Sequence, residues 1–594
     1  MKKAITVDVN GGTYSRTIIS QWFKYLLPAQ ILSSATASLS SIINGLIVGN
    51  CLPPEALVAL GFVVPMTSML GAIAAVISGG GRILCGQYMG RGDLKKLNDI
   101  FTDSIILAVV IGAAAMAAGL FLAVPFARLF GATGAATAAT AEYIRGIALG
   151  MIPTLLVPGL VVFLQMANEI KYAFASSLVL AAVSLAGGLL NVKVWQGGVF
   201  GMGIASSVGQ WITALFLLFR FVQKKDLMRF SLKNFEIKLS IKSLALGSPA
   251  ALAMLLYAVR NVVLNSMALK EGGAQAVSAL AILNSAMGPF DAVNIGTGAT
   301  ILILASVFTG EKDDQSMQML MKTGFRFGIL LGLAKIAVLV LGGKWLAILF
   351  GAEGTMIRDT YVLIVLYSLS MPLNMVMVTF MNPYQSLGRV SLSNIIYLFN
   401  ALLFPLGWCA LAGKLWGTIG MWLCYSVAEV LTLAVIMLVS WKKCGHFPRT
   451  LGDYLWIPES GNVEKCSLSL RTMDQVTNIS QQLIDYCMSC GMDARRSKLC
   501  GLCMEEMAGN VILHGFTKGK PGRDYTVDLF VCCEEGEINM RLRDNAPAFD
   551  PRTKFGVLDP EDPCKNVGIR MVAALAKEIN YQSCFGMNTV SIKL

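Results

Sequence analysis

Long apolar stretches alternate with short polar segments along the first three quarters of the chain. An apolar stretch of about 20 residues is long enough to cross a bilayer as a helix. Twelve such stretches can be marked, at residues 20–48, 57–80, 102–126, 140–163, 174–194, 199–221, 243–268, 276–307, 324–348, 357–381, 392–411 and 417–440. The pattern therefore predicts a polytopic α-helical membrane protein with twelve transmembrane helices within residues 1–441.

The hydrophobic pattern changes after residue 441. Pro448, Pro458 and Gly461 mark residues 442–466 as a linker. Shorter periodic segments follow in residues 467–594, with helices predicted at 473–489, 494–514 and 567–578, and strands at 526–533, 538–543 and 588–593. These elements predict a C-terminal α/β sandwich of about 130 residues, which is large enough for one hydrophobic core.

Composition separates the same two parts. Hydrophobic residues make up 55% of the chain and charged residues 14%, and a mean hydropathy of +0.63 excludes an ordinary soluble enzyme. Lys and Arg exceed Asp and Glu by 15 in residues 1–450, whereas residues 451–594 have a net charge of −3. The positive charge lies in short loops beside apolar spans, so it does not predict binding to nucleic acid.

The basic residues also predict how the helices are oriented. With a cytoplasmic N-terminus, the inner segments hold 23 Lys and Arg residues and the outer loops hold seven. This asymmetry predicts a multi-pass protein of the cell membrane with both termini, and hence the C-terminal domain, in the cytoplasm. The first 20 residues lack an apolar core and a cleavage pattern, so no removable signal peptide is expected.

The membrane part resembles itself at an offset of 220 residues. Pairs at this offset include Gly90-Arg-Gly-Asp93 with Gly310-Glu-Lys-Asp313, Leu129-Phe-Gly-Ala132 with Leu349-Phe-Gly-Ala352, and Gln165 with Gln385. Several short matches at one offset indicate a duplicated unit of six helices, with repeats at about 15–221 and 240–441. An even number of helices makes both repeats enter the membrane in the same direction, an arrangement typical of secondary transporters.

Three segments carry a resemblance to a known family. They read INGLIVGNCLPPEALVALGFVVP, ending at Pro65, then GQYMGRGDLKKLNDIF at 86–101 and GGAQAVSALAI at 272–282. With them, residues 15–445 resemble the multidrug and toxic compound extrusion (MATE) family of transporters. The resemblance implies a V-shaped bundle of two six-helix lobes that exchanges a bulky amphipathic substrate for protons or sodium ions. Two alternatives are a flippase for lipids or amphipathic metabolites, and a membrane-bound signalling serine kinase or receptor that uses the bundle as a sensor.

Coupling to a cation needs a group within the membrane that binds a proton or ligates an ion, and such a group is costly there. The resembled family often has an aspartate where this chain has Asn44, which could ligate Na⁺ or only pack between helices. The ionisable residues within the predicted helices are Arg260, Asp291, Lys335 and Glu429. Asp291 follows Gly288-Pro289, a pair that interrupts a helix, and is expected beside Arg260, as a releasable or a permanent ion pair. Glu429 is a second candidate proton site, whereas Lys335 has no assigned role.

Three segments of the C-terminal domain carry candidate chemistry. Glu506, Asn510 and His514 are spaced i, i+4 and i+8, which suits a carboxylate base, a Mg²⁺-ligating amide and a phosphate contact along one helical face. Asp544 stands in RDNAPAFDP, where its carboxylate could accept a hydrogen bond from an adenine amino group, and Asp550 of the same segment is a further nucleotide-binding candidate. Gly568 opens a helix, and a glycine there lets backbone N–H groups approach a phosphate.

In this order the three segments resemble the nucleotide-binding boxes of the histidine-kinase-like (GHKL, or Bergerat) ATPase fold. The anti-sigma-factor serine kinases are the subgroup that they resemble most, and Asn588 before the last strand fits that subgroup. The resemblance implies ATP with Mg²⁺ as cofactor, Glu506 as the catalytic base and Asn510 as the Mg²⁺ ligand. Its expected partners are a cytoplasmic regulatory protein, in addition to membrane lipids and the small amphipathic substrate.

Other features of the C-terminal domain leave alternatives open. Ala546 and Ala548 replace glycines of the resembled fold, so a docking domain without ATP turnover is the alternative to a nucleotide-binding one. Cys487-x-x-Cys490 and Cys500-x-x-Cys503 have a spacing that could bind Zn²⁺. Because both pairs fall within predicted helices, small buried apolar side chains are the alternative interpretation.

Overall fold

The computed structural model describes residues 15–51, 54–223, 228, 230, 235–456, 465–519, 524–534, 536–554, 567–584 and 586–594. The chain divides into two compact units. The membrane unit is Leu27–Trp456, and the C-terminal unit joins Ile457–Leu594 to Met1–Leu26. The division at Trp456 falls inside the predicted linker, and the beginning of the chain belongs with the C-terminal domain.

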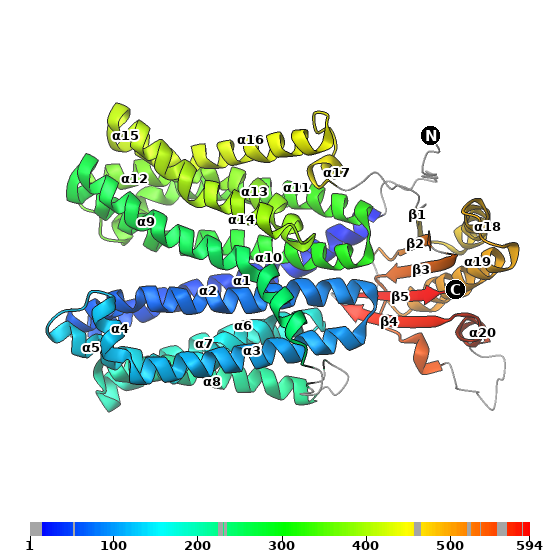
Figure 1. Ribbon diagram of the computed structural model, residues 1–594, viewed down its shortest axis with the longest axis horizontal. Helices are drawn as coiled ribbons and strands as arrows, with labels where there is room; N and C mark the ends of the chain where they lie inside the picture. Colours follow the sequence, from blue (N-terminus) through cyan, green and yellow to red (C-terminus); the bar gives the residue numbers. More distant parts are fainter. Residues whose placement is uncertain are drawn as a thin grey trace. The chain divides into compact units, whose positions relative to one another are not determined.

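The membrane unit is built from long helices in two groups, which we call the first and the second lobe (Figure 1). The first lobe comprises α1 (Ser15–Cys51), α2 (Pro54–Arg91), α3 (Leu94–Phe121), α4 (Ala123–Leu129), α5 (Ala135–Ala148), α6 (Met151–Met166), α7 (Ile170–Leu190) and α8 (Gly198–Gln223). The second comprises α9 (Ile237–Ala286), α10 (Gly288–Glu311), α11 (Asp314–Leu349), α12 (Thr355–Ser368), α13 (Ser370–Ser386), α14 (Val390–Leu398), α15 (Phe404–Trp422) and α16 (Cys424–Cys444), followed by α17 (Leu451–Tyr454). The two lobes correspond to the two predicted repeats.

The length and hydropathy of these helices support a polytopic membrane protein. Among the described residues, ten helical stretches are long and apolar enough to cross a membrane. The number is eleven if α5 and α6, which meet at an angle of 47°, form one bent span. The helix α1, which covers the first predicted span, is not among these ten or eleven.

Two glycines with non-helical backbone angles interrupt the long helices α9 and α15. Gly273 in α9 has a φ of 65° and Gly417 in α15 a φ of 60°. Glycine adopts these left-handed values without steric cost because it has no Cβ. Both lie where the hydrophobic pattern predicts a change of span. A further break separates α9 from α10 at Met287, and Pro289 stands in the first turn of α10, where proline is well tolerated.

Equivalent positions of the two lobes have the same backbone. Gly134, with φ 57° and ψ −134°, and Gly354, with φ 54° and ψ −127°, precede α5 and α12. Asp93 and Asp313 cap α3 and α11, and each side chain accepts a hydrogen bond from the backbone N–H three residues further on. Both pairs are 220 residues apart. The structure therefore repeats the unit that the sequence predicts.

The two lobes meet at several close helix contacts, one of which is the crossing of α2 and α10. A Cβ added to Gly90 would lie 2.2 Å from the carbonyl oxygen of Val307, and one added to Gly310 would lie 2.0 Å from that of Gln87. Val307 and Gln87 are themselves equivalent positions, so the contact is reciprocal between the repeats. Only glycine permits so close an approach of two helix backbones. This crossing fixes the two lobes against each other at the ends of α2 and α10.

The C-terminal unit contains an antiparallel sheet of order β1-β2-β3-β5-β4 (Figure 1). Its strands are β1 (Lys465–Leu470), β2 (Val527–Glu534), β3 (Glu537–Asp544), β4 (Glu578–Cys584) and β5 (Met587–Lys593). Its helices are α18 (Met473–Ser489), α19 (Ala494–Asn510) and α20 (Val567–Leu575). The buried side chains of these elements form one core, which includes Leu470, Leu483, Met504, Leu529 and Val590. An α/β arrangement with one core is what the sequence predicts.

The secondary structure differs from the prediction at both edges of this sheet. The predicted helix 567–578 ends at Leu575, and residues 578–584 form the edge strand β4. At the other edge, residues 465–470 form β1 although the sequence predicts a linker up to 466. Each edge strand has one neighbour, β5 for β4 and β2 for β1, and this pairing decides its conformation. The local sequence alone does not contain that information.

The paired cysteines pack in the core of the C-terminal unit. Cys487, Cys500 and Cys503 have no measurable exposure and lie among the core side chains of α18 and α19. Within the described part of the chain, no group of three or more His, Cys, Asp or Glu side chains is placed to hold a metal ion. The structure thus favours the interpretation of these thiols as small buried apolar groups over a zinc site.

Candidate transport cavity and nucleotide site

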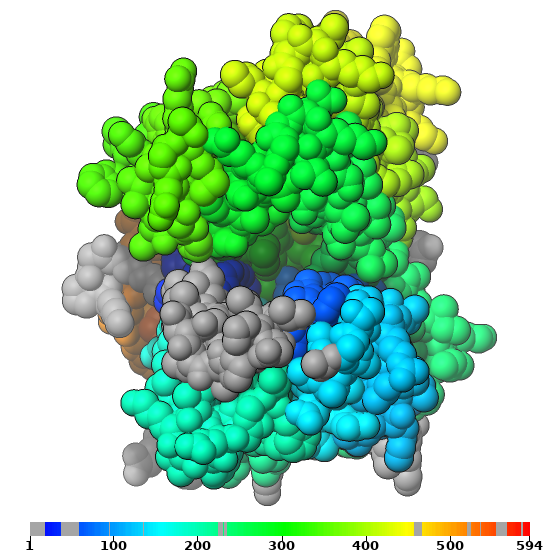
Figure 2. Space-filling model, turned by 90° about the vertical axis from the view of Figure 1, so that its left-hand side faces the viewer, coloured from blue at the N-terminus to red at the C-terminus, as the bar shows by residue number. Residues whose placement is uncertain are grey.

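A cavity of about 940 Å³ lies between the two lobes of the membrane unit. Figure 2 shows the surface hollowed between segments of the first lobe in blue and cyan and segments of the second lobe in green. Polar residues line it on both sides, among them Gln30, Ser33, Ser78 and Gln165 from the first lobe and Asn284, Asn294, Asn374 and Asn400 from the second. Predicted candidates Arg260, Asp291 and Glu429 all line this cavity. The side chain of Asn44 is outside the described part of α1.

The structure adds Arg82 to the charged groups of the cavity. The sequence predicts Arg82 in a cytoplasmic segment because the apolar stretch ends near residue 80, yet α2 continues to Arg91. Its side chain lines the cavity from the first lobe, and its Nε is buried without a hydrogen-bond partner among the described residues. No proline stands between residues 81 and 90, so the sequence allows the helix to continue past the apolar stretch.

Asp291 stands in the first turn of α10, after the break at Met287. The hydroxyl of Tyr367 on α12 donates a hydrogen bond of 3.4 Å to its Oδ1. Lys335 on α11 is 5% exposed, and its ammonium donates to Oδ1 of Asn294, one turn after Asp291. Lys335 also attracts Asp291 electrostatically. Lys335, for which the sequence suggests no role, therefore belongs to the polar surroundings of Asp291.

Arg260 on α9 differs from its predicted arrangement. Its guanidinium lies over the rings of Tyr257 and Tyr425, 4.8 and 5.2 Å from their centroids. Its Nε makes no hydrogen bond, and no ion pair joins Arg260 to Asp291 within the described residues. A planar guanidinium is stabilised on aromatic faces, so the two tyrosines hold it away from the carboxylate. The predicted ion pair with Asp291 is therefore not formed in this conformation.

Glu429 on α16 is 6% exposed. The Nδ2 of Asn374 on α13 donates a hydrogen bond of 2.7 Å to its Oε1. Its Oε2 is buried and has no hydrogen-bond partner among the described residues. A buried carboxylate with one unsatisfied oxygen is stable only when it is protonated or when a cation binds to it. Glu429 therefore has the surroundings of a cation-binding group.

In the C-terminal unit, Glu506 and Gly568 lie against each other. A Cβ on Gly568 would be 1.7 Å from Oε2 of Glu506, so a larger residue at the start of α20 would displace the Glu506 carboxylate. Asn510 is one turn beyond Glu506, and its Nδ2 donates a hydrogen bond of 2.7 Å to the backbone oxygen of Glu506. His514 is exposed and lies in a short π-helical turn, Val511–Gly515. The structure thus joins the predicted base to the predicted phosphate segment, of which Asn566 is outside the described residues.

Asp544 ends β3 and is 4% exposed. Its Oδ1 accepts hydrogen bonds from the backbone N–H of Ala546, at 2.9 Å, and from Nδ2 of Asn588, at 2.8 Å. The hydroxyl of Tyr581 donates to Oδ1 of Asn588 at 2.9 Å and fixes the orientation of that amide. Burial raises the pKa of Asp544 to about 6. Both of these hydrogen bonds end on one oxygen, so Oδ2 can accept from a ligand.

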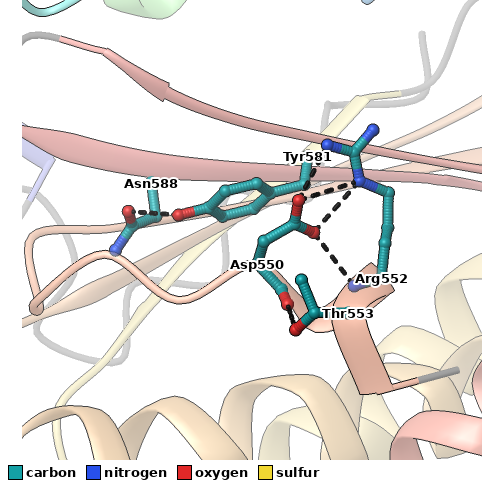
Figure 3. Close-up of polar contacts among 5 residues, drawn as sticks. All are labelled: Asp550, Arg552, Thr553, Tyr581 and Asn588. Carbon is teal, nitrogen blue, oxygen red and sulfur yellow. Dashed lines mark hydrogen bonds and ion pairs between the residues drawn. The ribbon is translucent and has the colours of Figure 1, made fainter. Parts of the chain in front are cut away.

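Asp550 is held differently from Asp544 (Figure 3). Its carboxylate forms an ion pair of 2.8 Å with Arg552, and its backbone oxygen accepts a hydrogen bond from Thr553. The guanidinium of Arg552 is in turn 6.0 Å from the ring of Tyr581. The ion pair of Asp550 and Arg552 thus lies beside the hydrogen-bonded pair of Tyr581 and Asn588. The ion pair satisfies the carboxylate of Asp550, which leaves Asp544 as the better acceptor for a ligand.

Two equivalent helical lobes around a polar cavity define a polytopic transporter of the parallel-repeat type. The MatE family model matches residues 29–190 and 249–409, which together are more than half of the chain. Each match falls within one lobe. The chain belongs to the MatE family, the family of MATE transporters that the sequence resembles.

Known proteins resemble the chain at low identity. A probable multidrug resistance protein, YoeA of Bacillus subtilis (strain 168), is 21% identical over 319 residues, which are 52% of this chain and 68% of that protein. A solved outward-facing multidrug resistance MATE family transporter of the MOP superfamily matches with a TM-score of 0.66 and 19% identity, over 73% of this chain and 97% of that one. A MOP superfamily transporter from Pyrococcus furiosus Vc1 matches with a TM-score of 0.64 and 20% identity, over 70% and 94%. These structures share the fold of the membrane unit.

Proposed function

We propose that the membrane unit exports small amphipathic compounds in exchange for H⁺ or Na⁺. The observation that carries this proposal is Glu429, a buried carboxylate of the cavity wall that has no ion pair and no hydrogen bond to its Oε2 among the described residues. Such a group binds a proton or a cation during each cycle and releases it in the next. Asp291 shares the cavity and is the second candidate. The name of the Bacillus relative, a probable multidrug resistance protein, agrees with export of foreign compounds.

In the proposed transport cycle, the cavity opens alternately to the two sides of the membrane. The lobes touch at the α2–α10 crossing, close to the loop that the positive charge places in the cytoplasm. The conformation described here is thus open on the opposite side, and transport requires this crossing to separate. Loading the second-lobe carboxylates with a cation from outside favours the return to the inward-open state, where substrate displaces the cation.

Flux measurements in proteoliposomes test the coupling. Proteoliposomes that contain the wild-type protein are loaded with a fluorescent amphipathic cation. They are expected to export it when a proton or sodium gradient is imposed. Glu429→Gln should lose the gradient-driven component yet keep downhill counterflow, because the amide fills the same space without a titratable or cation-binding charge. Glu353→Gln, a change at an exposed residue, is the matched control. Gradient-driven export by Glu429→Gln at the wild-type rate would exclude this carboxylate as the coupling group.

We propose in addition that the C-terminal unit binds ATP with Mg²⁺ and regulates transport. Three features of the described residues fit a nucleotide. Asp544 offers Oδ2 as an acceptor for an amino group, and Asn510, whose Nδ2 is engaged, offers its Oδ1 as an oxygen ligand for Mg²⁺. Gly568 has no Cβ, so the start of α20 lies against the Glu506 side chain, where backbone N–H groups would meet a phosphate.

The residues of this site would divide the work as follows. Asp544, oriented by Asn588, binds the base, and Glu506 accepts a proton from the attacking hydroxyl of water or of a partner protein. His514, which is exposed, and the Asp550–Arg552 pair contact the outer part of the nucleotide. Bound Mg²⁺ neutralises the charge of the phosphates. An ATP-dependent transport stroke is not part of this proposal, because the single C-terminal unit has no second copy in the chain.

Binding of MgATP to the full-length protein in detergent or nanodiscs tests this second proposal. Asp544→Asn is expected to abolish binding, and Asn510→Ala to remove its dependence on Mg²⁺. Glu505→Gln, the neighbour of Glu506 on α19, is the matched control and should bind normally. If the wild-type protein binds no MgATP, the C-terminal unit is a docking domain.

The alternatives that the sequence leaves open predict different results. A flippase would move labelled phospholipid between leaflets without a cation gradient. A receptor or signalling kinase would show no counterflow, while its ligand would change phosphate transfer by the C-terminal unit. The cavity of about 940 Å³, which suits a drug-sized guest, favours the exporter over the receptor.

A further inference from the structure

The beginning of α1 carries an apolar stripe that neither proposed site uses. Ile18, Ile19, Trp22, Phe23 and Leu26 lie on one face of the helix, and each is at most 2% exposed. These residues belong to the C-terminal unit, although they are more than 400 positions away from it in the chain. The segment before the membrane-spanning part of α1 is therefore built as part of the C-terminal domain.

Two specific contacts hold this segment. The guanidinium of Arg543 on β3 lies 4.4 Å from the ring of Trp22, which gives a cation–π contact. The Nδ2 of Asn545 donates a hydrogen bond of 2.9 Å to Oε1 of Gln21. Asn545 is 1% exposed and also bonds the N–H of Thr526 and the carbonyl of Asp524, at 2.9 and 2.7 Å. One buried amide thus ties α1 to the segment before β2.

The residues that hold α1 are the neighbours of the proposed base-binding residue. Arg543 and Asp544 are consecutive on β3, so their side chains point to opposite faces of the sheet. Asp544 faces the same side as Leu542, which belongs to the core under the helices. Within residues 543–545, Arg543 and Asn545 therefore contact α1, and Asp544 between them belongs to the proposed nucleotide site.

The helix that begins in this segment also lines the transport cavity. α1 runs from Ser15 to Cys51 as one helix. Gln30 and Ser33, about one to two turns beyond Leu26, face the cavity, and Gln30 donates a hydrogen bond of 2.8 Å to Gln165. Pro28 lies inside α1 between the docked residues and Gln30, and the helix continues past it, so a displacement of residues 15–26 can be transmitted along α1 to the cavity wall.

We propose that residues 15–26 are a docking segment for the C-terminal domain, and that a nucleotide bound at Asp544 tightens this docking and so controls transport through α1. The proposal rests on the nucleotide-binding function proposed above. A bound base restrains Asp544 and with it Asn545, which strengthens the hydrogen bond to Gln21. Binding of the nucleotide and docking of α1 then take place at the same end of β3, and each strengthens the other.

Hydrogen exchange of the full-length protein, with and without MgATP, tests the coupling. MgATP is expected to slow exchange in residues 15–26 by about fivefold or more. Gln21→Ala should remove this effect while MgATP still binds. Gln21→Glu should retain it, because a carboxylate accepts the same hydrogen bond from Asn545. In proteoliposomes, MgATP should change the export rate of the wild type and of Gln21→Glu, but not that of Gln21→Ala.

Binding of MgATP is measured on the same samples, so two failures are told apart. If MgATP binds but leaves exchange in residues 15–26 and export unchanged, the coupling is wrong and the nucleotide site stands. A response of Gln21→Ala equal to that of Gln21→Glu also overturns the coupling. If the wild type binds no MgATP, the proposed nucleotide function fails, and the regulation inferred from it fails too.

Discussion

Asp544 holds its carboxylate at 4% exposure, with two donors on a single oxygen. Burial raises its pKa from 3.8 to about 6, so the folded protein holds this proton more tightly than the unfolded chain does. The contribution of Asp544 to the free energy of unfolding therefore decreases as pH rises from 3.8 to about 6, and is constant above that. Above pH 6 the buried negative charge of Asp544 therefore lowers the stability of the C-terminal domain, a cost that is common at functional sites.

This gives a prediction for pH and for Asp544→Asn. Binding of MgATP should weaken by about tenfold per pH unit below pH 6, because the protonated carboxyl loses its charge as an acceptor. Asn can keep both hydrogen bonds to Oδ1, so Asp544→Asn should raise the stability of the C-terminal domain at pH 7.5 by about 1–3 kcal/mol. Isothermal titration from pH 5 to 8 and denaturant unfolding measure the two effects. A variant that is destabilised would show that the carboxylate is structural.

Gly568 allows a second prediction at a single residue. Gly568→Ala places a Cβ 1.7 Å from Oε2 of Glu506, so the Glu506 carboxylate must move away from the start of α20. MgATP binding should weaken accordingly. Gly509→Ala in α19 is the matched control, because its Cβ would meet Met473 at an ordinary 3.6 Å. Equal binding by both variants would separate Gly568 from the nucleotide site.

At the level of elements, the crossing of α2 and α10 is one of the contacts between the lobes that the proposed transport cycle has to break. Gly90 and Gly310 let the two backbones approach, and the crossing is reciprocal between the repeats. The periodicity of the chain predicts both helices. It does not predict their contact, because glycines inside apolar spans are common and only the packing gives these two their role.

Gly310→Ala tests this contact. The added Cβ would lie 2.0 Å from the carbonyl oxygen of Gln87, so the conformation described here should lose about 1–3 kcal/mol relative to the separated one. The rate of export should fall, and a cysteine-reactive probe should reach this crossing from the cytoplasmic side more readily. Gly342→Ala, which meets no atom within 4 Å, should behave as the wild type. Reduced export by both variants would point to a general loss of folding.

At the level of the whole molecule, the chain combines a membrane unit with a C-terminal unit that includes the first residues of the chain. Both ends of the chain must therefore lie on the same side of the membrane. The charge asymmetry predicts that this side is the cytoplasm. A protease added to sealed inside-out vesicles is expected to cleave tags at both the N- and the C-terminus, and to leave both intact in right-side-out vesicles. Cleavage of only one tag in either preparation would contradict the predicted orientation.

The sequence by itself determined the membrane class, the duplication and the family, because apolar spans, charge asymmetry and matches at one offset are local or repeated signals. It also placed Glu429 and Asp291 in the membrane, since a charge in an apolar span is visible in one dimension. Only the tertiary structure decided that Arg260 stacks on tyrosines, that Lys335 lies near Asp291 and that Arg82 reaches the cavity. It alone brought residues 18–26 to Arg543 and Asn545, and decided strands β1 and β4. Each of these depends on a partner distant in the chain, and the identity of such a partner is set by packing and not by local pattern.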